Sequence, residues 1–179
     1  AGDQIDRATP RRWLLISREM AILSEEEGNG RWSLDHIFLD QDAIPTLVEV
    51  KRSSDSRSRR EVIGQMLDYA ANVVIYWPIE SIVVQFEGNC RDQGRDPEQV
   101  FEEFLGSDAD EERFWQKVKT NLQAGKVRLV FVADDIPAEL RRVVEFLNEQ
   151  MDPTEVLAVE MKQYVSQEGL KTLVPRIIG

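Results

Sequence analysis

The chain has 179 residues, of which 42% are hydrophobic and 31% charged, and its formal net charge is −11. This composition predicts one folded domain and excludes a disordered protein, while the negative charge excludes a general coat on nucleic acid. One cysteine cannot form an internal disulfide, and one histidine argues against a histidine-rich metal site. No apolar run is long enough to span a bilayer, so we expect a cytoplasmic protein with no membrane partner.

The first third of the chain predicts three strands. Residues 12–18 form the first, 32–40 alternate in hydrophobicity, and 46–52 form the third after the turn sequence QDAIP. Two strands joined by so short a turn predict an antiparallel hairpin. Alternation places Asp35 on the face opposite His36.

The rest of the chain alternates between helices and strands. Apolar residues recur every three or four positions over 58–76, which predicts an amphipathic helix. Residues 79–124 predict a helical insertion broken at Gly94–Pro97 and Gly106–Asp108, and this insertion carries most of the acid. A strand at 126–133, a helix to about residue 150 and strands at 156–165 and 170–178 follow. We expect residues 1–179 to form a single α/β domain, with a mixed central sheet flanked by helices.

The predicted hairpin brings three ionisable side chains together. Glu49 and Lys51 share one face of their strand, and Asp35 can lie opposite either of them, because both registers keep the turn within QDAIP. Opposed Cβ atoms are about 5 Å apart, close enough for two carboxylates to share one cation. Oxygen ligands suit Mg²⁺ or Mn²⁺, and the backbone carbonyl of Val50 could be a third protein ligand.

This arrangement indicates phosphodiester hydrolysis. A bound metal neutralises charge on a phosphoryl oxygen, and Lys51 beside it could orient the attacking water and stabilise the transition state. The Glu-x-Lys pattern alone is common, and Glu160-Met161-Lys162 repeats it after another apolar run. We favour the first copy, because it has Asp35 across the hairpin and a basic segment after it.

That basic segment covers residues 51–60, KRSSDSRSRR. We expect its arginines to grip phosphates at the start of the following helix, whose macrodipole they would otherwise oppose. The alternative is a solvated loop and helix start. The arginines predicted to bind nucleic acid are Arg52, Arg57, Arg59 and Arg60.

Three polar residues on this helix are spaced by four: Glu61, Gln65 and Tyr69. We expect them to flank the apolar stripe rather than to lie within it. Gln65 could then hydrogen-bond to a metal ligand or a phosphate, and Tyr69 could stack on a base or touch the nucleic-acid backbone. The alternative is an ordinary polar shoulder on a half-buried helix.

In this order, Asp35, Glu49-Val50-Lys51 and Gln65-Met66-Leu67-Asp68-Tyr69 resemble the PD-(D/E)XK nuclease superfamily. The Gln-x-x-x-Tyr helix is typical of its RecB-like branch, and LVEVKR followed by GQMLDYA is similar to the NucS-like endonucleases. The resemblance covers residues 12–76 well and extends to about 165 through the order of elements.

The resemblance implies a restriction endonuclease-like core and a Mg²⁺-dependent nuclease acting on DNA in repair, recombination or defence. It implies that Asp35 and Glu49 are metal ligands, that Lys51 is the catalytic lysine, and that Gln65 and Tyr69 are accessory site residues. Members commonly carry an acidic residue on a helix before the first strand, whereas only residues 1–10 precede Arg11. Either that helix is missing from this chain or the site works without it.

Two other functions remain open. One is a DNA-binding module with the nuclease fold and no turnover. The other is an acidic protein-interaction domain that docks through residues 79–124. The expected partner of the leading hypothesis is DNA, and whether the chain acts alone or as a homodimer is left open.

Overall fold

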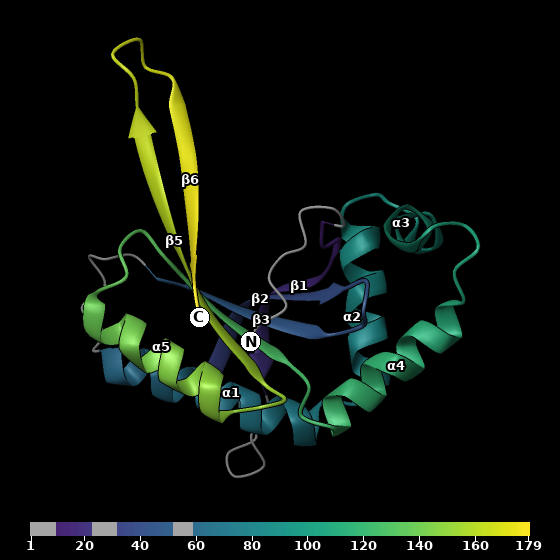
Figure 1. Ribbon diagram of the computed structural model, residues 1–179. Helices are drawn as coiled ribbons and strands as arrows, with labels where there is room; N and C mark the ends of the chain where they lie inside the picture. Colours follow the sequence, from purple (N-terminus) through teal and green to yellow (C-terminus); the bar gives the residue numbers. More distant parts are fainter. Residues whose placement is uncertain (1–9, 23–31, 52–58) are drawn as a thin grey trace.

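The computed structural model describes residues 10–22, 32–51 and 59–179. In these ranges six strands form one sheet in the order β1-β2-β3-β4-β5-β6, flanked by five helices (Figure 1). The elements, in chain order, are β1 (Trp13–Ile22), β2 (Trp32–Asp40), β3 (Pro45–Lys51), α1 (Arg59–Tyr76), α2 (Ile79–Asp92), α3 (Pro97–Leu105), α4 (Glu111–Gln123), β4 (Arg128–Ala133), α5 (Ala138–Gln150), β5 (Glu155–Val165) and β6 (Lys171–Ile178).

The sheet is mixed, as the order of elements predicts. β1, β2 and β3 pair antiparallel, whereas β3, β4 and β5 pair parallel, and β6 returns antiparallel to β5. The chain leaves β4 through α5 and re-enters the sheet at β5, which is the usual crossover for parallel strands. The predicted α/β class and the antiparallel β2–β3 hairpin are therefore confirmed.

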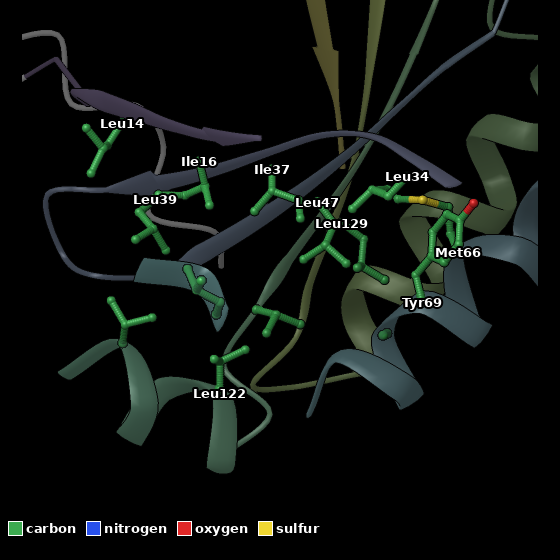
Figure 2. Close-up of a cluster of buried hydrophobic side chains, with 14 of the residues drawn as sticks. Leu14, Ile16, Leu34, Ile37, Leu39, Leu47, Met66, Tyr69, Leu122 and Leu129 are labelled. Carbon is green, nitrogen blue, oxygen red and sulfur yellow. The ribbon is translucent and has the colours of Figure 1, made fainter. Parts of the chain in front are cut away.

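One face of the sheet carries most of the core. Leu47, Leu129 and Val156 lie in one row across β3, β4 and β5, and all three are almost completely buried. α2 packs on the same face beside β1, where Gln85 donates to the Ser17 hydroxyl at 3.1 Å. Figure 2 shows the resulting cluster, with Met66 and Tyr69 contributed by α1.

The helical insertion breaks where the sequence predicts. Asp96 caps α3 by accepting from the Glu98 N–H at 3.1 Å, and Asp110 caps α4 by accepting from the Arg113 N–H at 3.0 Å. Four aromatic side chains then join α2, α3 and α4 to one another. They are Phe86, Phe101, Phe114 and Trp115, whose ring centroids lie 5.4–6.2 Å apart in contacting pairs.

A buried ion pair joins the β2–β3 turn to β4. Asp40 is fully buried, and its Oδ2 accepts from Arg11 at 2.7 Å and from Arg128 at 3.1 Å. Arg128 also donates to the Thr46 hydroxyl at 3.0 Å and pairs with Glu155 at the start of β5. Five strands, β1 to β5, are therefore tied together at this end of the sheet, because β1 begins two residues after Arg11.

The same carboxylate shapes the turn itself. Asp40 Oδ1 accepts from the N–H groups of Asp42 at 3.0 Å and Ile44 at 2.9 Å. Ala43 has a φ of 60°, and the Asn121 amide of α4 donates to its carbonyl at 2.8 Å. The turn is thus held from inside by Asp40 and from outside by the helical insertion.

β5 and β6 continue beyond the other strands as a two-stranded hairpin (Figure 1). Glu160 is the last buried residue of β5, and every residue from Lys162 to Ile177 is exposed. Within the described part of the chain, no helix is long and apolar enough to cross a membrane.

We predict that Arg128→Met destabilises the fold by about 3 kcal/mol, because removing one partner of a buried ion pair leaves the other charge poorly compensated. Urea unfolding measures the change. Arg95→Met is the matched control: Arg95 pairs with Glu103 at 2.5 Å on the surface, and such pairs contribute less than about 1 kcal/mol. Equal losses in the two variants would show that the buried network does not hold the sheet.

Candidate functional site

The end of β3 carries a carboxylate and an ammonium on the same face. Glu49 lies in the buried row with Phe131 and Ala158, and only 1% of its surface is exposed. The Lys51 ammonium forms an ion pair with Glu49, and 16% of the Lys51 side chain is accessible to solvent. A buried acid is therefore compensated by a cation that reaches the surface.

Asp35 meets this pair from β2. The β2–β3 pairs run from Leu39 opposite Pro45 to His36 opposite Val48, and Asp35 and Glu49 are the next residues on the two strands, just past the last regular pair. The paired part of the hairpin therefore has the first of the two registers that the sequence allows, the one whose turn centres on Asp42. The Asp35 carboxylate accepts a hydrogen bond from the Val50 N–H at 2.7 Å, so it is fixed to the residue between Glu49 and Lys51.

This contact also indicates the direction in which the backbone carbonyl of Val50 points. The N–H and C=O of one strand residue point to the same edge of the strand. Because the Val50 N–H is directed at Asp35, the Val50 carbonyl lies on the same edge, toward β2. The structure thus brings the three predicted metal ligands together at the end of β3: Glu49 and Val50 belong to that strand, and Asp35 reaches it from β2.

The donor set fits a small hard cation. Two carboxylates and a carbonyl offer only oxygen, which suits Mg²⁺ with water and phosphate in its other positions. Across residues 10–22, 32–51 and 59–179, no group of three or more His, Cys, Asp or Glu side chains is placed to hold a metal ion. The protein would therefore hold such an ion by two acids and not by a complete cage.

The structure corrects the expectation for Gln65 and Tyr69. They do not flank the apolar stripe of α1 but lie within its buried face, with 6% and 0% of their surfaces exposed. The Gln65 amide donates to the Tyr69 hydroxyl. Because Tyr69 packs in the core with Met66, it cannot stack on a base in this structure. The four-residue spacing allows this contact inside the helix–sheet interface. The Gln65 side-chain oxygen, Oε1, is also buried there but has no hydrogen-bond partner among the described residues.

The predicted phosphate-gripping arginines are described only in part. Arg52 and Arg57 lie outside the described residues. The backbones of Arg59 and Arg60 form the first turn of α1, in the place that the sequence predicts. Glu61, the third member of the polar series on that helix, is exposed.

The second Glu-x-Lys pattern lies closer to the first than the sequence analysis anticipates. Lys51, Ala133 and Glu160 occupy one row across β3, β4 and β5, so Glu160 shares the face and the end of the sheet with Lys51. Parallel neighbours are about 4.8 Å apart, which sets the two positions about 10 Å apart across a small alanine. The repeated Glu-x-Lys pattern could have predicted this proximity, since equivalent positions of neighbouring parallel strands lie at the same end of the sheet.

Glu160 is held in its ionised form by its surroundings. The Ile136 N–H donates to the Glu160 carboxylate at 3.3 Å, and Lys162 lies 3.5 Å from its other oxygen. The Ile136 hydrogen bond is the main reason that the pKa of Glu160 lies below its ordinary value; burial opposes this effect and Lys162 reinforces it.

No family model, curated protein or solved structure matches this chain. The site therefore rests on its own geometry and on the ordered set of residues in the sequence.

We predict that Glu160→Gln destabilises the fold in a pH-dependent way. The folded pKa of Glu160 is lowered, so its stabilising contribution is present above the ordinary glutamate pKa and is lost as the pH falls through the folded value. The difference in unfolding free energy between wild type and variant should shrink on acidification. Urea titrations over a pH series measure it, with Glu168→Gln in the exposed β5–β6 turn as the control for losing one charge. A difference that is constant with pH would contradict the prediction.

Proposed function

We propose that this chain is a Mg²⁺-dependent deoxyribonuclease of the PD-(D/E)XK type, built on a restriction endonuclease-like core. The observation that carries the proposal is the meeting of Asp35, Glu49 and Lys51 at the end of β3, with Asp35 bonded to the intervening Val50 N–H. Register, not sequence proximity, produces this meeting, because Asp35 comes from a different strand.

Each group at the site has a role that its position supports. Asp35, Glu49 and the Val50 carbonyl would hold the ion, which when bound supplies neutralisation of charge on a phosphoryl oxygen. Lys51 is the only one of these groups with hydrogen-bond donors on its side chain, and it reaches solvent. We assign it to orient the attacking water and to donate to the phosphate oxygen that gains negative charge.

Gln65 and Tyr69 act in this proposal as positioning residues and not as groups that touch DNA. Their burial supports that assignment, since neither presents a surface to a large substrate. The DNA strand would instead be gripped by the basic run that follows Lys51, through Arg52, Arg57, Arg59 and Arg60. The high density of arginine next to the site in an otherwise acidic chain supports DNA as the substrate.

We predict that the protein cleaves labelled single- or double-stranded DNA with Mg²⁺ or Mn²⁺, and that Lys51→Ala lowers the rate about 100-fold or more, the usual loss for one donor to a transition state. Asp35→Asn should have a similar effect by weakening the ion site. Lys162→Ala is the matched control, because it removes the lysine of the second Glu-x-Lys pattern and should cleave like wild type.

Binding measured beside cleavage separates the alternatives. A protein that binds DNA in a salt-sensitive manner but cuts none under any metal condition is a binding module, and the hydrolytic proposal is then wrong. Neither binding nor cleavage would favour the acidic protein-interaction domain. Cleavage that Lys51→Ala leaves unchanged would place the chemistry elsewhere.

A further inference from the structure

The projecting part of the β5–β6 hairpin, residues 161–178, is here called the arm. Six of the ten exposed large hydrophobic residues in the described part of the chain lie on it, although it is a small fraction of that part. Isolated two-stranded hairpins are marginally stable in water, and monomeric proteins rarely expose large apolar patches. By the pairing of the strands, Val165, Leu173 and Ile177 lie on one face of the hairpin, and Tyr164 and Val174 lie on the other. The exposed residues are Tyr164, Val165, Leu170, Leu173, Val174 and Ile177.

The arm presents a face rather than an edge. Met161 pairs with Pro175, Gln163 with Leu173 and Val165 with Lys171, so one face is apolar along most of its length. Pro175 lies on β6, the edge strand, and has no N–H to donate. A proline at this place disfavours the addition of a further strand. The partner of the arm is therefore a surface that packs against side chains.

The helical insertion carries a surface of matching character. α2 and α4 form a groove of about 430 Å³. Its apolar lining includes Val84, which is 65% exposed, and Trp115, while Glu80 and Glu112 supply acid at the same place.

The charges of the two surfaces are complementary. From residue 162 onward the arm has four charged side chains, and three of them, Lys162, Lys171 and Arg176, are basic. In residues 79–124, by contrast, acidic side chains outnumber basic ones. Lys171 lies on the apolar face of the arm, whereas Lys162 and Arg176 lie on the opposite face beside Glu160. The groove has Glu80 and Glu112 against Lys119. The net charges of the arm and the groove are therefore opposite, which favours their association.

The two surfaces of one chain cannot meet each other in this fold. Figure 1 shows the arm rising on one side of the molecule and the α2–α4 region lying on the other. In a pair of copies, however, the arm of each chain can contact the groove of the other. Two reciprocal contacts related by a twofold axis close the assembly, whereas one-way contacts would leave it open.

We propose that two copies of this chain form a dimer by exchanging arms, with the apolar face of each arm seated in the α2–α4 groove of the other. The proposal is independent of the nuclease proposal, because neither Glu49 nor Lys51 takes part in the contact. The basic residues of the arm could also attract DNA phosphates, but phosphate binding gives no reason for its exposed leucines and valines.

Sedimentation velocity over a wide concentration range tests the dimer, which should have twice the monomer mass of 20.6 kDa. Leu173→Glu on the arm and Val84→Glu in the groove should each weaken dimerisation at least about tenfold, because each places a charge in an apolar contact. Phe146→Glu is the matched control: Phe146 is an exposed apolar residue of α5 outside both surfaces, and its variant should dimerise like wild type. Circular dichroism confirms that each variant is folded.

Mixing the two variants provides a second readout. An equimolar mixture of Leu173→Glu and Val84→Glu chains can form one intact arm–groove contact, so it should dimerise more tightly than either variant alone. A wild-type chain that stays monomeric at every concentration overturns the proposal. The proposal fails in the same way if the chain is monomeric and the arm variants change only its affinity for DNA. A dimer that Leu173→Glu dissociates and Val84→Glu does not also overturns it, since the arm would then dock elsewhere.

Discussion

The buried ion pair between Asp40 and Arg128 is the constraint on which the arrangement of this sheet depends. The Asp40 carboxylate accepts hydrogen bonds from N–H groups of the β2–β3 turn. It also pairs with the guanidinium of Arg128 on β4, 88 residues away in the sequence. Charges buried this deeply are tolerated only with good partners, so the turn and the start of β4 have few alternative positions. The register of β2 on β3, and of β3 on β4, follows from that anchor.

The candidate site lies at the opposite end of the same hairpin and depends on that register. A shift of one residue would turn Asp35, Glu49 and Lys51 to the other face of the sheet. Where regular β2–β3 pairing stops, at His36 and Val48, the Asp35 carboxylate takes a backbone N–H of β3 as its partner. The side chain thus occupies a position that a ladder carbonyl would fill, and this keeps it beside Glu49.

Local patterns in the sequence predicted much of this. Alternation and the short turn led to the correct hairpin and left two registers open, of which the structure has one. The glycines and prolines of residues 79–124 marked the helix ends. Burial of Gln65 and Tyr69 was missed because a polar residue beside an apolar stripe has the same spacing whether it faces solvent or satisfies a neighbour inside the core. The Asp40–Arg128 pair and the row joining Lys51 to Glu160 were missed because they depend on which strands become neighbours, and no local pattern encodes that.

The long sequence separation within the anchor has a consequence for synthesis on the ribosome. The hairpin that bears Asp35, Glu49 and Lys51 emerges early together with Arg11, but the Arg128 guanidinium that joins Asp40 to β4 is synthesised 88 residues later. Contacts this distant in sequence form slowly, because a long loop must close first. A nascent chain that ends within the helical insertion would hold all the candidate site residues and still lack the contact that fixes their register.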